Sequence, residues 1–128
     1  MLERVQQAGH PVTQAQGRLA ARIGPDGTRL TELAAAAQVT KQTAGFLVDQ
    51  LEKSGYVERV PDPTDARARL VRLAPRGLEV VEVAEGVEAE IRSEWEDHLG
   101  SAAYAELETT MARLCEITDP YAPGTPAA

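Results

Sequence analysis

Two groups of side chains in the first two-thirds of the chain have the types and spacing that suit contact with nucleic acid. The first group brings a cation, an amide and a hydroxyl into one predicted helical turn, as Lys41, Gln42 and Thr43. A lysine ammonium pairs with phosphate or guanine, and a glutamine amide can make two hydrogen bonds to adenine. A helix that enters a major groove by its N-terminal end would present these three residues first.

The outward face of the same predicted helix continues with an aromatic and an acidic residue. Phe46 follows one turn later, where its ring could cover a thymine methyl group. Asp49 lies one turn further and would repel phosphate, so binding is not expected to depend on that end of the helix. The alternative is an ordinary solvated helix face, on which an exposed phenylalanine would be unusual.

The second group surrounds Arg67, in the polar, proline-punctuated segment 61–68. An arginine at the tip of a hairpin can enter a minor groove and respond to its width and negative potential. We expect Asp65 to hold Arg67 by a charge-assisted hydrogen bond, and Arg69 to contact phosphate or to solubilise the strand. The alternative is a polar loop whose aspartate and arginine only pair with each other, which contributes at most about 1 kcal/mol when exposed.

Residues for other chemistries are not found together. Nucleophilic catalysis needs a nucleophile with an oriented base, and no such set or phosphate-cradling glycine loop is visible. His10 and His98 are too few for a zinc site with several histidine ligands. Cys115 lies in the acidic third, which does not favour a reactive thiolate, so we expect an inert or interfacial thiol. The sequence therefore predicts neither an enzyme nor a metal or other cofactor.

Charge is distributed unevenly along the 128 residues, whose net charge is −7. Residues 1–80 carry eleven basic and nine acidic side chains, whereas residues 81–128 carry two and eleven. The first part can therefore face phosphates although the chain as a whole is acidic. No apolar run approaches the roughly 18 residues of a membrane span, no signal-peptide core follows Met1, and there is one cysteine, so we expect a cytoplasmic protein with no membrane partner.

Hydrophobic periodicity places the first group on a helix and the second on a β-hairpin. Thr40 is the expected N-cap of a helix that runs to Ser54, with an apolar stripe on its buried side. Strand-like runs at 56–60 and 69–73 flank a long exposed tip. Shorter helices are predicted at 2–9, from Thr13 with a capping box to Gln16, and at 31–37 with Thr31 as N-cap.

Two longer helices are predicted after the hairpin, at Pro75–Leu99 and from Ser101, as its cap, to about Thr118. The first has a broad apolar surface, and such surface in a short chain is usually covered by a partner chain. The predicted fold class is mainly α with a small β-wing, a winged helix-turn-helix lobe followed by C-terminal dimerisation helices. The predicted organisation is a short N-terminal helix contributing to dimerisation (1–11), the DNA-binding lobe (12–74), the dimerisation helices (75–118) and a flexible tail (119–128).

The order of these motifs resembles the multiple-antibiotic-resistance regulator (MarR) family. The resemblance rests on the runs 30–34, 39–42 and 47–59 and on the wing, 62–73. Its most specific part is Asp65-Ala66-Arg67-Ala68, followed by Arg76-Gly77. The likeness covers roughly residues 12–99, and the ordered combination is far more specific than any single piece.

The resemblance implies a bacterial, homodimeric transcription regulator that binds a pseudo-palindromic operator and represses by occluding the promoter. Its implied partners are double-stranded DNA, a second copy of the chain and a small amphipathic effector, which in this family binds between the DNA-binding lobe and the dimerisation helices. On this basis the expected DNA-binding residues are Thr40, Lys41, Gln42, Thr43, Phe46, Asp65, Arg67 and Arg69.

Three departures from the family pattern are visible, and the last of them favours a different interpretation. The first helix is short, Gln38 stands where the helix-turn-helix turn often has glycine, and Gly45-Phe46 replaces the usual threonine and arginine. Glutamine tolerates a positive φ less well than glycine. The alternative is a winged-helix protein–protein interaction module in which DNA binding is weakened or lost. The acidic C-terminal third suits that alternative, whereas Lys41, Gln42 and Arg67 favour DNA.

Overall fold

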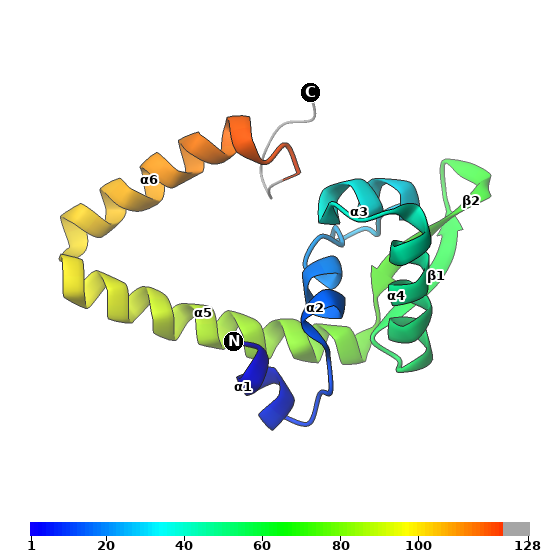
Figure 1. Cartoon of the computed structure of the whole chain (residues 1–128), viewed down its shortest axis with the longest axis horizontal. Helices are drawn as coiled ribbons and strands as arrows, with labels where there is room; N and C mark the ends of the chain where they lie inside the picture. Colours follow the sequence, from blue (N-terminus) through cyan, green and yellow to red (C-terminus); the bar gives the residue numbers. More distant parts are fainter. Residues whose placement is uncertain (122–128) are drawn as a thin grey trace. The chain divides into compact units, whose positions relative to one another are not determined.

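The computed structural model describes residues 1–121, which divide into two compact units, Met1–Glu85 and a second that begins at Gly86 (Figure 1). The predicted fold class, mainly α with a two-stranded wing, is confirmed. The predicted helix bounds Pro75–Leu99 and Ser101–Thr118 are also confirmed. The elements are α1 (Leu2–Gln7), α2 (Gln14–Ala20), α3 (Leu30–Ala37), α4 (Lys41–Lys53), β1 (Val57–Asp62), β2 (Asp65–Leu73), α5 (Pro75–Leu99) and α6 (Ser101–Thr118).

Two predicted helix caps are formed as the residue spacing requires. The Thr13 hydroxyl accepts a hydrogen bond from the Gln16 backbone N–H at 3.2 Å, and the Gln16 side chain accepts one from the Thr13 N–H at 3.1 Å. The Thr40 hydroxyl accepts from the Thr43 N–H at 3.1 Å. These bonds satisfy backbone donors that the first helical turn leaves unpaired.

Two other predicted caps, those of α3 and α6, are wrong. Helix α3 starts at Leu30 with Arg29 as its N-cap, so Thr31 lies inside the first turn. The Arg29 side chain is bound to the hairpin and Leu30 packs against the core, which moves the start by one residue. Helix α6 follows Gly100, whose φ of 88° suits glycine, so Ser101 is the first helical residue instead of the cap.

The core of the first unit is formed where α2, α3 and α4 pack with the hairpin. Its fully buried side chains are aliphatic, as the low aromatic content requires. The segment before α3 joins the hairpin edge, because Thr28 and Val71 exchange backbone hydrogen bonds of 2.8 and 2.9 Å. The most deeply buried residues are Leu19, Leu33, Val48 and Leu51.

Gln38 adopts a left-handed conformation, with φ 57° and ψ 44°, in the turn between α3 and α4. It is the one non-glycine residue with positive φ within residues 1–121. Its N–H donates to the Ala35 carbonyl at 3.1 Å, which closes the end of α3. The strain expected from the sequence is therefore present, at a cost of roughly 1–2 kcal/mol for a side chain in this region.

The hairpin is longer and its turn shorter than predicted. Pairing continues to Asp62 and Asp65, so the long exposed tip expected at 61–68 is wrong, and the turn consists of Pro63 and Thr64. The Asp62 carboxylate accepts hydrogen bonds from the Thr64 backbone N–H and hydroxyl at 2.8 and 2.7 Å, which closes the chain early. Arg67 therefore lies on strand β2 and not in a loop.

The second unit contains the later part of α5 and helix α6, which Arg92 and Glu108 connect. The Arg92 Nε and Nη2 atoms donate to one Glu108 oxygen at 3.0 and 2.6 Å. This ion pair, together with Tyr104, holds the pKa of Glu108 below its ordinary value. Large apolar side chains of this unit remain exposed within the described chain, namely Trp95, Leu99, Leu107, Met111, Leu114 and Ile117.

The remaining sequence predictions concern the C-terminal tail, the domain boundaries, the single cysteine and a membrane span. The predicted tail 119–128 lies mostly outside the described residues, and the domain boundaries stay predictions. Cys115 is a free, partly buried cysteine. No helix within residues 1–121 is long and apolar enough to cross a membrane.

The Arg76-Gly77 pair fixes the start of α5 against the end of α4 and the start of β1. The Arg76 guanidinium lies 4.5 Å from the centre of the Tyr56 ring and donates to the Ser54 carbonyl at 2.6 Å. A Cβ atom on Gly77 would collide with the Tyr56 carbonyl oxygen and press on Leu73 at 3.2 Å. Residue 77 must therefore be glycine for this approach to form.

Gly77→Ala is expected to lower the free energy of unfolding by about 1–3 kcal/mol, because the added methyl group forces the backbone of α5 away from Tyr56. Gly86→Ala in the same helix is the matched control, since a Cβ there meets nothing within 4 Å. It should raise stability by about 0.5–1 kcal/mol. Urea unfolding followed by circular dichroism measures both, and equal effects of the two substitutions would contradict the assignment.

Candidate nucleic-acid interface

The first turn of α4 presents exposed polar side chains on a capped helix end. Thr40 caps the helix, and its hydroxyl also donates to the Thr43 hydroxyl at 3.0 Å. These two hydroxyls are therefore partly committed to each other. Lys41 and Gln42 are exposed beside them, so the cation and amide expected to meet phosphate and base both point outward from the unit.

Phe46 extends this outward face by one turn and is 61 % exposed. Its neighbour Gly45 faces α3, where a Cβ would lie 3.7 Å from the Leu30 side chain. Phenylalanine is more often buried, and this exposed ring is accessible to a partner surface. Gln42, Phe46 and Asp49 thus share one exposed face of α4, as the helical spacing predicts, and Lys41 is exposed beside it in the first turn.

Asp49, on the same face, is paired with an arginine that the sequence analysis did not single out. Arg59 of β1 donates to Asp49 at 2.7 Å and to Glu52 at 2.9 Å. The signal for it was available, because a basic residue two positions after the buried Val57 lies on the strand face that packs toward the helices. The partner residues could not be deduced, since nothing local specifies how β1 sits against α4.

On the wing, the hairpin β1–β2, Asp65 does not bind Arg67 in the way expected. Its carboxylate accepts from the Arg67 backbone N–H at 3.0 Å, and its other oxygen lies 3.9 Å from Arg29. The strand geometry explains this correction, because Asp65 begins β2 and bonds to its own backbone two residues on. The Arg67 guanidinium is exposed and has no ion-pair partner within residues 1–121.

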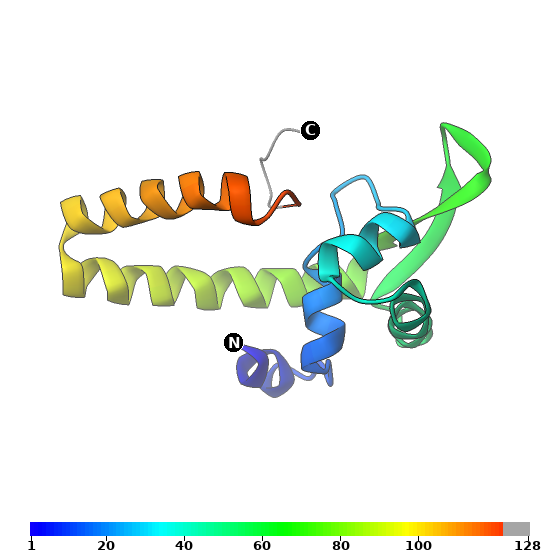
Figure 2. The ribbon, with the colours of Figure 1, turned by 45° about the horizontal axis from the view of Figure 1, so that its top comes forward.

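Arg69 is also exposed and has no ion-pair partner within residues 1–121, whereas Arg72 on the same strand is paired. Arg72 donates to Glu58 across the hairpin at 2.6 Å. Strand alternation puts Arg67 and Arg69 on the face that also carries the buried Val71. In both ribbon views the turn of the wing projects away from the helices of the first unit (Figures 1 and 2).

An ion pair between Arg29 and Asp62 anchors the wing to the start of α3. The Arg29 Nε and Nη2 atoms lie 2.9 and 2.7 Å from one Asp62 oxygen. The Asp62 side chain is only 6 % exposed. Hydrogen bonds from Thr64 and then from Arg29 stabilise the carboxylate and lower the pKa of Asp62 to about 2. Sequence reasoning missed this pair because its members are 33 residues apart.

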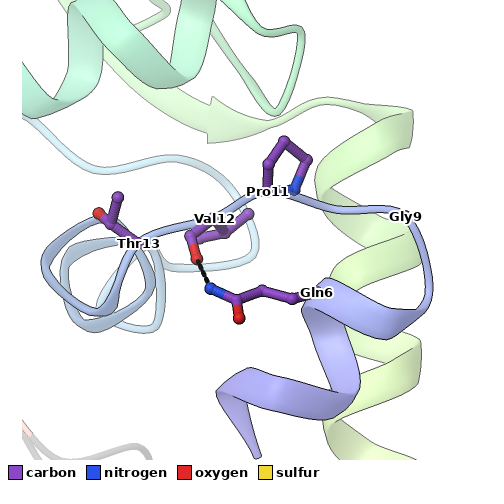
Figure 3. Close-up of a pocket in the computed structure, with 5 residues that line it drawn as sticks. All are labelled: Gln6, Gly9, Pro11, Val12 and Thr13. Carbon is purple, nitrogen blue, oxygen red and sulfur yellow. Dashed lines mark hydrogen bonds between the residues drawn. The ribbon is translucent and has the colours of Figure 1, made fainter.

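A shallow hollow of about 490 Å³ lies at the segment between α1 and α2 (Figure 3). It is lined by Gln6, Gly9, Pro11, Val12 and Thr13, and the Gln6 amide donates to the Val12 carbonyl across it at 3.4 Å. The adjacent His10 is buried, with Nδ1 3.2 Å from the Tyr56 hydroxyl and Nε2 3.8 Å from Glu79. The hollow overlaps the segment 11–19, which the family resemblance makes one candidate wall of an effector site, and that role stays a prediction.

The match to a family model decides the relationship of this chain to known proteins. The model of the MarR family matches residues 9–68. This segment contains α2–α4, β1 and the turn of the wing. Solved MarR structures agree over most of the chain. The chain belongs to the MarR family. Members of this family are transcription regulators and not enzymes.

Relatives of known name and structure show how far the likeness extends. The chain is 30 % identical over 103 residues to the transcriptional activatory protein BadR of Rhodopseudomonas palustris, a match covering 80 % of this chain and 58 % of BadR. RV1404 of Mycobacterium tuberculosis has 25 % identity and a TM-score of 0.71, over 91 % of this chain and 80 % of that one. A mutant MarR from E. coli, solved in complex with operator DNA, shares the fold at 24 % identity and a TM-score of 0.63, over 88 % and 80 % of the two chains.

Stability should fall in acid as Asp62 is protonated. Because its pKa drops from 3.8 to about 2 on folding, the contribution of its carboxylate is complete above about pH 4 and is lost as the pH falls toward 2. Asp62→Asn should therefore be less stable than wild type near pH 6, and the difference should shrink through that window. Urea midpoints of both proteins across pH measure it, and a constant difference would exclude the Asp62 carboxylate as the cause.

Proposed function

We propose that this chain is a sequence-specific DNA-binding transcription regulator that contacts DNA through α4 and the wing. The observation that carries the proposal is how its basic side chains divide. Arg29, Arg59 and Arg72 are held by carboxylates. Lys41, Arg67 and Arg69 are exposed and have no ion pair within residues 1–121. The free cations stand on the helix end and the wing face that a winged helix would apply to DNA.

Each part of the surface has a proposed role. Lys41 pairs with phosphate or guanine, Gln42 with adenine, and Phe46 with a thymine methyl group in the major groove. Arg67 enters the minor groove and Arg69 contacts phosphate. Thr40 and Thr43 shape the helix end and contact the backbone beside it. Asp65 shapes the strand that carries Arg67, and its own charge makes no favourable phosphate contact.

We also propose that two copies of the chain bind one operator. The apolar side chains exposed on α5 and α6 are the surface that a second copy would cover, since such patches are rare on monomers. A twofold dimer would read two half-sites about one helical turn apart. A small amphipathic effector would then act by binding the DNA-competent and incompetent forms with different affinity. A regulator of this kind works in the cytoplasm of a bacterium.

Repression by occluding a promoter is the proposed outcome, and activation is the second candidate. The likeness to BadR, a protein named as an activator, favours the second candidate. A reporter placed behind the operator distinguishes them, because deletion of the regulator raises expression in one case and lowers it in the other.

Selection from a random-sequence duplex library tests the proposed function directly. The protein should enrich one pseudo-palindromic sequence. It should also bind that duplex more tightly than a scrambled one, with affinity falling about a hundredfold or more between about 50 and about 200 mM salt. Failure to enrich any sequence, with weak and equal binding to both duplexes, would favour the protein–protein interaction module.

Arg67→Ala should weaken binding to the selected duplex by about 1–3 kcal/mol and leave the melting temperature unchanged, because the side chain is exposed and unpaired. Arg72→Ala on the same strand is the control, since Glu58 already holds that guanidinium. Its effect should be clearly smaller. A fluorescence anisotropy titration compares them, and an unchanged affinity for Arg67→Ala would remove the wing from the interface.

A further inference from the structure

We infer that Arg59 is a positioning residue for DNA binding, which acts through Asp49 and Glu52 of α4 by keeping these two carboxylates from opposing the phosphates. The inference rests on the proposed function, because it concerns how the same surface is made able to bind. It assigns to Arg59 a task that needs no contact between Arg59 and DNA.

The geometry shows an arginine that reaches from the sheet to the helix. Arg59 pairs in register with Val71 and follows Val57 on the same strand face, and both valines are buried. Its side chain is only 19 % exposed, and its guanidinium emerges at the edge of α4. There Nη2 lies 2.7 Å from Asp49 and Nη1 lies 2.9 Å from Glu52. A planar guanidinium can hold two separate carboxylates in this way, and an ammonium cannot hold them in the same fixed geometry.

The two carboxylates would oppose binding if Arg59 were absent. Asp49 and Glu52 are three residues apart on α4, so they are neighbours and repel each other. Asp49 shares the outward face with Gln42 and Phe46, and its side chain is 70 % exposed. At physiological salt, charges act over about 8 Å, so a free carboxylate on this face would meet the DNA backbone.

A second ion pair on the hairpin, between Arg72 and Glu58, differs from the contacts of Arg59. Arg72 and Glu58 pair across the strands at exposed positions and touch no helix in this contact. Arg59 instead connects β1 to α4, the two elements that would enter adjacent grooves. The Arg59 contacts should therefore cancel the negative charge of α4 at the point where this helix meets the wing.

The test compares four proteins on the duplex selected by wild type: wild type, R59A, R59A/D49N/E52Q and D49N/E52Q. R59A should bind about tenfold or more weakly, because two carboxylates are released toward the phosphates. The triple variant should recover most of that loss, to within about threefold of wild type. The D49N/E52Q variant should bind at least as tightly as wild type, since it frees the Arg59 cation. Melting temperatures confirm that each protein is folded, and R59Q, which removes the charge but keeps a longer polar side chain, replaces R59A in the same comparison if R59A does not fold.

Each outcome decides the inference. Recovery in the triple variant supports it, because neither a stabilising role nor direct DNA contact by Arg59 is restored by neutral amides. R59A binding as tightly as wild type, or a triple variant as weak as R59A, would overturn it and leave the proposed function standing. A wild-type protein that binds no duplex would overturn the proposed function and this inference together.

Discussion

Tyr56 is the residue on which the arrangement of the first unit depends. It is 4 % exposed, and four segments of the chain meet around it. Its N–H donates to Leu51 at the end of α4, and its carbonyl accepts from Ala74 before α5. Its ring packs edge-on against His10 and beneath the Arg76 guanidinium. The side chain and peptide groups of this one residue therefore connect the end of α4, the start of the wing, the N-terminal segment and the start of α5.

Features specified by neighbouring residues could be predicted from the sequence, and features specified by distant ones could not. Thr13 and Thr40 cap helices through residues three positions away, and the long runs at α5 and α6 carry their own periodicity. The Arg29–Asp62 and Arg59–Asp49 pairs join residues that only the folded chain brings together. Two errors involve the members of the first pair, since Arg29 caps α3 in place of Thr31 and Asp62 closes the wing turn by its hydrogen bonds with Thr64. The outward face of α4 was predictable because it is the complement of a buried stripe.

An acidic chain can present a basic surface when its carboxylates form ion pairs with particular arginines. Net charge at a distance disfavours DNA, but the local field depends on which side chains are neutralised. In the first unit the arginines that brace the wing take up Asp49, Glu52, Glu58 and Asp62. The same ion pairs therefore fix the shape of the wing and leave Lys41, Arg67 and Arg69 as the dominant charges near it.

The pleat of β2 limits how the wing of such a protein can change in evolution. Arg67 and Arg69 share a face only because they are two residues apart on a continuous strand. Inserting or deleting one residue between them and Val71 would turn both guanidinium groups to the other face. A change of two residues would keep the face and alter only the reach. Related wings should therefore vary in length by even steps, or acquire a bulge that restores the phase.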